Sequence, residues 1–80
     1  MDIIYSKKAI KFINKLDKIK KQKLKIAIEK LPDGDTKAVS GYNLITNRLR
    51  LGDLRVLYYF DNGNLFIEKI GYRGNVYKGA

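Results

Sequence analysis

The sequence contains no cysteine and no histidine, and only eight of its 80 residues are acidic. Without cysteine and histidine, the chain cannot form a catalytic triad, a thiol nucleophile or an ordinary zinc site. The acidic residues form no cluster typical of a magnesium site, and the glycine patterns that bind nucleotide phosphates are missing. We therefore expect neither a cofactor nor a metal.

Long apolar runs are missing too. No stretch approaches the length of the apolar core of a secretion signal or of a membrane span, so we expect a cytoplasmic protein with no membrane partner. The length fits one domain over residues 1–80, and a chain this short buries only a modest core. Marginal stability, or stabilisation by a partner, is the expected consequence.

The chain has an excess of positive charge. Seventeen basic residues give a net charge of +9, which attracts polyanions or an acidic protein segment. The lysines of the two predicted helices, including those within residues 18–25, form the densest charge run, for which we favour a solvated helix face over a dedicated binding patch. The four arginines are distributed differently, because all of them lie in the last three predicted elements: Arg48, Arg50, Arg55 and Arg73.

The first 32 residues predict a strand and two helices. Residues 2–5 are typical of a short strand, and Ser6 follows as a candidate helix cap. Apolar residues recur at helical spacing over residues 9–16 and again over 24–31. One continuous helix would be about 38 Å long, roughly twice the length of a six-residue strand. We therefore predict a helical hairpin with a break near Asp17, which would cap the second helix.

The remaining residues predict a loop followed by three strands. Residues 33–43 have a loop-like composition, residues 48–60 form a hairpin around Gly52 and Asp53, and residues 65–70 form the last strand. The predicted fold is α+β with the order β-αα-βββ. In it, the helical hairpin packs on one face of a mainly antiparallel four-stranded sheet.

The hairpin carries the first indication of function. Strand alternation separates its arginines from its leucines, and a two-residue loop would place Arg50 directly opposite Arg55. Opposed like charges destabilise a sheet unless an anion lies between them, and the planar guanidinium group matches phosphate. This pattern favours a phosphodiester site, although four ordinary solvated strand positions are an equally good interpretation of composition alone.

The side of the sheet on which Arg73 lies depends on the turn at residues 61–64. A two-residue loop would place Arg73 on the core face, away from Arg55. A three-residue loop with Gly63 in the left-handed conformation, or a bulge at Gly71, would turn Arg73 toward the other arginines. We predict one of these two arrangements.

Residues 48–58 and the later run Gly-Tyr-Arg-Gly-Asn-Val-Tyr at 71–77 resemble the RelE/ParE superfamily of bacterial toxins, and the element order matches as well. The RelE branch implies the toxin of a type II toxin–antitoxin system. Such a toxin is an mRNA interferase, an endoribonuclease that cleaves mRNA on the ribosome and is neutralised by a cognate antitoxin. The ParE branch implies a gyrase-binding toxin, and a non-catalytic RNA-binding module is a further alternative. The RelE-type basic positions favour the nuclease.

The resemblance also implies roles for single residues. Arg55 and Arg73 correspond to phosphate clamps that stabilise the transition state. Arg48 and Arg50 correspond to cations that position the RNA. Tyr77 corresponds to an orienting hydroxyl. Because both phosphate clamps lie away from the predicted core, we expect the fold to survive replacement of either by Ala.

The general base for the 2′-hydroxyl is not settled by the resemblance. Tyr72 stands where many members of the family have a histidine, and arginine does not deprotonate in proteins. Tyr72, Tyr77, a lysine or the ribosome itself remain candidates. Lys69 and Lys78 are further candidate RNA contacts.

Overall fold

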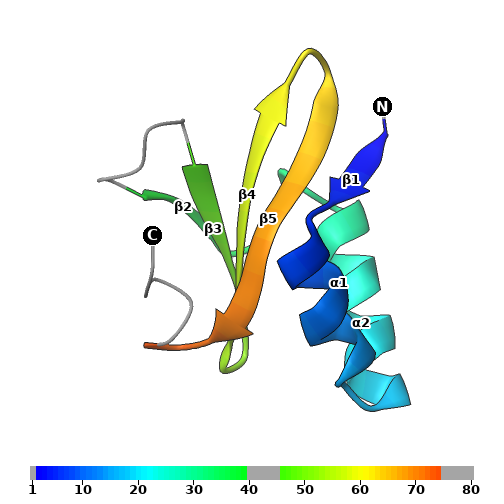
Figure 1. The fold of residues 1–80 in the computed structure, drawn as a ribbon. Coiled ribbons are helices and arrows are strands. Elements are labelled where there is room, and N and C mark those ends of the chain that lie inside the picture. The colour runs from blue at the N-terminus through cyan, green and yellow to red at the C-terminus, as the bar shows by residue number, and fades with distance from the viewer. Residues whose placement is uncertain (1, 40–45, 75–80) are drawn as a thin grey trace.

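The computed structural model describes residues 2–39 and 46–74, which form two helices on one face of a mixed five-stranded sheet (Figure 1). The elements in chain order are β1 Ile3–Tyr5, α1 Lys7–Asn14, α2 Lys18–Glu29, β2 Thr36–Val39, β3 Thr46–Leu51, β4 Leu54–Asp61 and β5 Asn64–Tyr72. Across the sheet the strand order is β1-β5-β4-β3-β2, and only β1 and β5 pair in parallel. Within the described residues, no helix is long and apolar enough to span a membrane.

The predicted helical hairpin and both of its caps are confirmed. The hydroxyl of Ser6 accepts a hydrogen bond from the backbone N–H of Ala9, at 3.1 Å. The carboxylate of Asp17 accepts one from the backbone N–H of Lys20, at 2.9 Å. Each side chain thereby satisfies an N–H group that has no partner inside its own helix. The chain consequently breaks between α1 and α2, and each helix is short enough to lie along the sheet.

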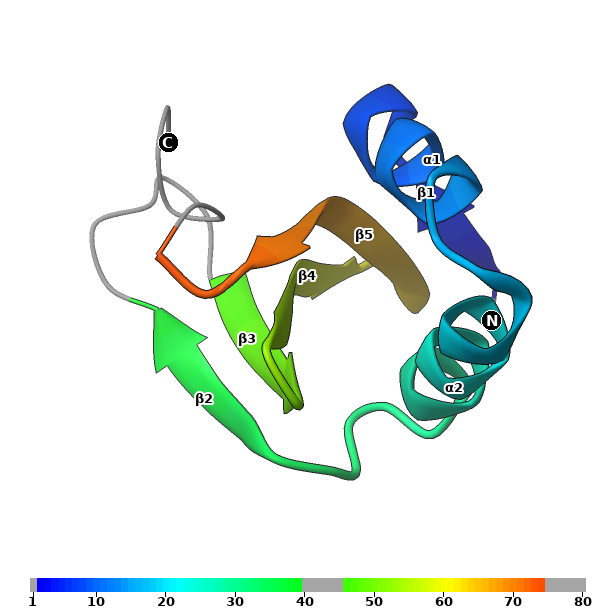
Figure 2. The same cartoon turned by 90° about the horizontal axis from the view of Figure 1, so that it is seen from below.

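Both helices lie on the same side of the sheet, as Figure 2 shows from below. The main hydrophobic core fills the space between them and the sheet. Its buried members are Ala9, Leu16, Leu24, Ile28, Leu31, Leu49, Leu54, Val56, Tyr58, Leu65, Ile67 and Ile70. The face of the sheet that receives the helices is therefore the leucine face of the predicted hairpin.

The prediction of four strands was wrong, because residues 36–39 form the edge strand β2 within the segment expected to be a loop. β2 pairs with β3 in antiparallel fashion, with Thr36 opposite Leu49 and Val39 opposite Thr46. The backbone N–H of Arg50 extends this ladder by donating to the carbonyl of Asp35, at 2.9 Å. This strand is four residues long and depends on its neighbour for hydrogen bonds, so its local composition gives little indication of it.

The prediction of a three-residue loop between the last two strands was also wrong. Asn62 and Gly63 form a two-residue turn with φ values of 51° and 78°, and Asp61 pairs with Asn64. Positive φ at both central residues is typical of a type I′ turn, whose twist matches that of a hairpin.

A β-bulge at Glu68 then corrects the register of β5. Leu57 pairs with Lys69 and Tyr58 pairs with Ile67, so Glu68 is an extra residue on β5. Beyond the bulge, Gly71 pairs with Arg55 and therefore lies on the arginine-bearing face of the sheet. A bulge is therefore present, three residues earlier than the one proposed at Gly71, while Arg73 itself lies in the turn just after β5.

Candidate functional site

The arginines lie on the face of the sheet opposite the helices, which we call the arginine face. The β3–β4 register confirms the two-residue turn at Gly52 and Asp53, with Arg48 opposite Leu57 and Arg50 opposite Arg55. On β5, Lys69 pairs with Leu57 and Gly71 pairs with Arg55, so each cross-strand pair continues onto the third strand. The structure thus brings three of the four arginines and Lys69 onto one surface of three adjacent strands.

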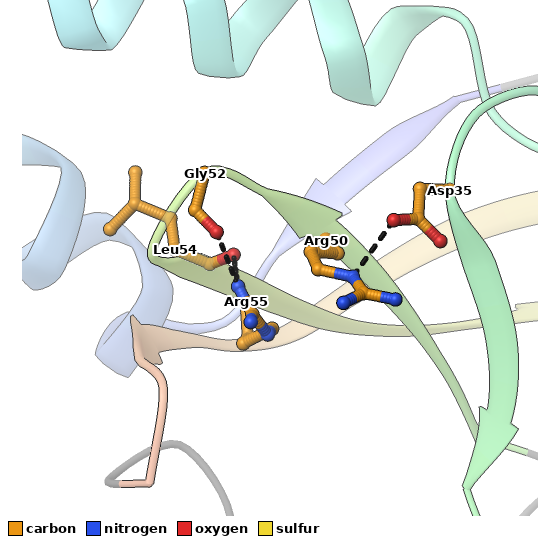
Figure 3. A network of polar contacts seen from close by, with 5 residues as sticks. All are labelled: Asp35, Arg50, Gly52, Leu54 and Arg55. Atoms are coloured by element: carbon orange, nitrogen blue, oxygen red, sulfur yellow. Dashed lines mark hydrogen bonds and ion pairs between the residues drawn. The ribbon is translucent and has the colours of Figure 1, made fainter.

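Arg50 has a charged partner within the chain. Its Nε lies 2.8 Å from Oδ2 of Asp35, the residue just before β2 (Figure 3). The two residues are also joined through the backbone, which makes them a cross-strand pair of opposite charge. Asp35 was not predicted as part of the site, because its proximity to Arg50 depends on the unpredicted strand β2.

Arg55 is buried, with only 6% of its surface exposed. Its Nη1 donates hydrogen bonds to the backbone carbonyls of Gly52, at 2.7 Å, and of Leu54, at 2.9 Å (Figure 3). The two opposed guanidinium groups are therefore held by different partners, one by a carboxylate and the other by the turn. The opposition of Arg50 and Arg55 does not by itself require a bound anion, contrary to the argument from the sequence.

The centre of the arginine face is buried independently of the main core. Leu57 is completely buried, yet it is not a member of the cluster beneath the helices. Two polar atoms on this face are buried without a hydrogen-bond partner, Nε of Arg48 and Oε2 of Glu68. Glu68 was not among the predicted site residues, because only the bulge reveals that it shares this face with Lys69.

Of the predicted tyrosines, Tyr72 is described by the structure, and it is not brought together with Arg55. Tyr72 pairs with Leu54 on the helix face, where its ring makes an edge contact with Phe12, with 5.5 Å between the ring centres. Arg73 is exposed, and its backbone N–H donates to the carbonyl of Asp53, at 2.9 Å. Tyr77 and Lys78 lie outside the described residues.

Two tyrosines with altered acidity belong to the main core. Burial raises the pKa of Tyr58, an effect that a hydrogen bond with Thr36 partly opposes. Burial also raises the pKa of Tyr5, and the nearby Glu29 carboxylate adds to that rise. A raised pKa keeps a phenol neutral, and both side chains lie on the helix side of the sheet. We therefore interpret both as packing residues.

The described residues contain no group of three or more acidic side chains placed to hold a metal ion. The arrangement instead offers cations, a carboxylate with one buried oxygen, and backbone groups. Such a surface suits recognition of a phosphodiester, whose oxygens accept hydrogen bonds from guanidinium groups.

Comparison with solved structures identifies the fold. The chain superimposes on a RelE–RelB complex component from Pyrococcus horikoshii with a TM-score of 0.72 and 25% identity, covering 94% of this chain and 97% of that one. This chain has the fold of RelE toxins. A component of the RelB–RelE antitoxin–toxin complex of Methanococcus jannaschii gives a TM-score of 0.73 at 17% identity, over 88% of this chain and 89% of that one. For the Escherichia coli RelBE complex, the TM-score is 0.56 at 16% identity, with 89% and 94% covered. No family model and no curated protein sequence matches this RelE-like chain.

Proposed function

We propose that this RelE-like protein is the toxin of a toxin–antitoxin module and cleaves mRNA on the ribosome. The observation that carries the proposal is the arginine face, on which opposed cations lie on a RelE fold. In the proposed reaction, the 2′-oxygen attacks the adjacent phosphorus and the bond to the 5′-oxygen breaks. No metal is needed, because guanidinium groups can stabilise the charge of the pentacoordinate phosphorus.

The geometry supports different tasks for three of the arginines. The Asp35 ion pair uses Nε of Arg50, which leaves the two terminal nitrogens of Arg50 to face a phosphate. Arg73 is exposed just beyond the end of β5 and is our principal candidate for the transition-state contact. Arg55 holds the turn in the structure, so its contact with phosphate requires that it exchange at least one backbone carbonyl for a phosphate oxygen.

The proposed activity is tested by incubating the protein with programmed ribosomes and mapping the mRNA ends. We expect cleavage that depends on the ribosome and falls about 10²- to 10³-fold when Arg73 is replaced by Ala. A parallel assay with DNA gyrase tests the ParE-like alternative. Inhibition of gyrase without mRNA cleavage would contradict the nuclease.

We also propose a cognate antitoxin as the partner, and the helices offer a surface for it. A groove of about 290 Å³ runs between α1 and α2, and its lining is mostly apolar with lysines at the rim. The chemistry fits an acidic amphipathic segment, which would cover the apolar lining and pair with the lysines. The lining residues are Tyr5, Ile10, Ile13, Asn14, Lys21, Leu24, Lys25 and Ile28.

Two isoleucines provide a matched test of the groove. Ile10 lines it, whereas Ile19 is more exposed and does not contribute to its lining. We expect Ile10→Asp to prevent co-purification with the product of the adjacent gene and to leave ribosomal cleavage intact, while Ile19→Asp retains both. Equal co-purification of the two variants would refute this docking surface.

A further inference from the structure

One carboxylate oxygen of Glu68, Oε2, is buried without a hydrogen-bond partner, and the packing of the described residues gives no reason for it. The β5 bulge places Glu68 and Lys69 side by side opposite Leu57, and Arg48 flanks Leu57 on β3. A carboxylate oxygen that is buried without a hydrogen-bond donor is unfavourable, and such groups are rare in folded proteins. The position of this oxygen at the centre of the arginine face therefore suggests a role for which an acceptor without a partner in the free protein is needed.

We propose that Glu68 is the general base of the cleavage reaction, an inference that rests on the proposed nuclease function. The Glu68 carboxylate accepts the proton of the 2′-hydroxyl while the 2′-oxygen forms its bond to phosphorus. The bond from phosphorus to the 5′-oxygen then breaks, and that oxygen takes a proton from water. The resulting hydroxide removes the proton from the Glu68 carboxyl, which regenerates both the water and the carboxylate. The products are a 2′,3′-cyclic phosphate and a 5′-hydroxyl end, with no net consumption of water or oxidant.

The backbone around Glu68 is fixed, as a base requires. The hydroxyl of Ser6 donates a 2.6 Å hydrogen bond to the Glu68 carbonyl, which ties the bulge to the start of α1. Leu57, the β4 residue opposite the bulge, is two residues from Arg55, which corresponds to a distance of about 7 Å along the strand. One ribose with its 3′-phosphate spans such a distance, so its hydroxyl can face Glu68 while its phosphate faces the arginines.

The other carboxylates on this face are less suited to the role. Asp35 is already paired with Arg50, and Asp61 lies at the far end of β4 beside the turn. The charged or titratable groups facing Glu68 are Arg48 and Arg50 from β3, Arg55 and Tyr59 from β4, and Lys69 from β5, while the β1–α1 junction contributes the Ser6 hydroxyl. Within this described set, Glu68 carries the only carboxylate.

The test compares Glu68→Gln with Glu29→Gln, which makes the same chemical change at the chain's other glutamate, exposed on α2. In single-turnover cleavage of ribosome-bound mRNA, we expect Glu68→Gln to slow the reaction about 10²- to 10⁴-fold and to remove the acid limb of the pH–rate profile. Ribosome binding should be unchanged. The thermal midpoint should stay the same or rise, because the variant removes an unpaired buried charge. Glu29→Gln should leave cleavage and its pH profile unaltered.

A Glu68→Gln variant that cleaves within threefold of the wild type would overturn the inference while leaving the nuclease in place. A lower thermal midpoint with an unchanged pH profile would also overturn it, since Glu68 would then be a structural partner of Arg48. A wild-type protein that cleaves no ribosome-bound mRNA would overturn the proposed function and this inference together. The wild-type control therefore separates the two failures.

Discussion

Replacing Arg55 by Ala should destabilise the fold, because this side chain holds the β3–β4 turn. Its buried Nη1 bridges the carbonyls of Gly52 and Leu54. A hydrogen bond from a charged group contributes about 1.5–3 kcal/mol, and two bonds that share one nitrogen contribute less than twice that amount. We therefore expect a loss of about 2–4 kcal/mol in the free energy of unfolding. For a domain of this size, that loss lowers the thermal midpoint by roughly 10–30 °C.

Thermal unfolding followed by circular dichroism measures this effect directly. Arg73→Ala is the matched control, because Arg73 is exposed and its described hydrogen bond is made by the backbone. That variant should unfold within about 0.5 kcal/mol of the wild type. The sequence led us to expect that the fold survives replacement of either Arg55 or Arg73 by Ala. From the structure, we expect this only for Arg73. An Arg55→Ala protein that unfolds at the wild-type temperature would refute the role assigned to this side chain.

Three further predictions concern the charges. Asp35→Asn removes the carboxylate that competes with phosphate for Arg50, so RNA binding should strengthen. The slope of the logarithm of the binding constant against the logarithm of the salt concentration should steepen by up to about 0.7. The free energy of unfolding should change by less than about 1 kcal/mol. Cleavage of ribosome-bound mRNA should survive EDTA when the ribosomes are protected from magnesium loss, and restoration of a lost activity by zinc or manganese on a minimal substrate would contradict the arginine mechanism. Replacement of Lys20 or Lys21 by Ala should slow association at low salt without changing the cleavage step, as measured by single-turnover rates at saturating protein.

The sequence predicted those parts of the fold that depend on neighbouring residues. Ser6 and Asp17 are recognisable as helix caps because the groups they satisfy lie three residues away. The turn at Gly52 and Asp53 is likewise a local feature, and it fixes the pairing of β3 with β4. The two faces of the hairpin follow from that pairing, so their assignment was correct.

The features that were missed depend on residues far apart in the chain. β2 is a strand because β3 supplies its hydrogen bonds, and the Asp35–Arg50 contact follows from that pairing. The bulge at Glu68 lies between two registers of β5: the register set by the tight turn, in which Tyr58 pairs with Ile67, and the register beyond it, in which Leu57 pairs with Lys69. Strand alternation alone would have placed Glu68 and Lys69 on opposite faces, so no local pattern indicates that they lie together.

The two faces of this sheet meet different physical demands. The helix face contains an apolar cluster, and packing of such a cluster is the main source of stability in a small domain. The arginine face instead holds opposed cations and two unpartnered buried atoms, on Arg48 and Glu68, arrangements that lower stability. Substitutions that neutralise this face should therefore stabilise the free protein where no hydrogen bond is lost, whereas Arg55, which holds the turn, is the exception. A cation-rich face that costs stability in the free protein is consistent with a surface selected to bind an anionic substrate.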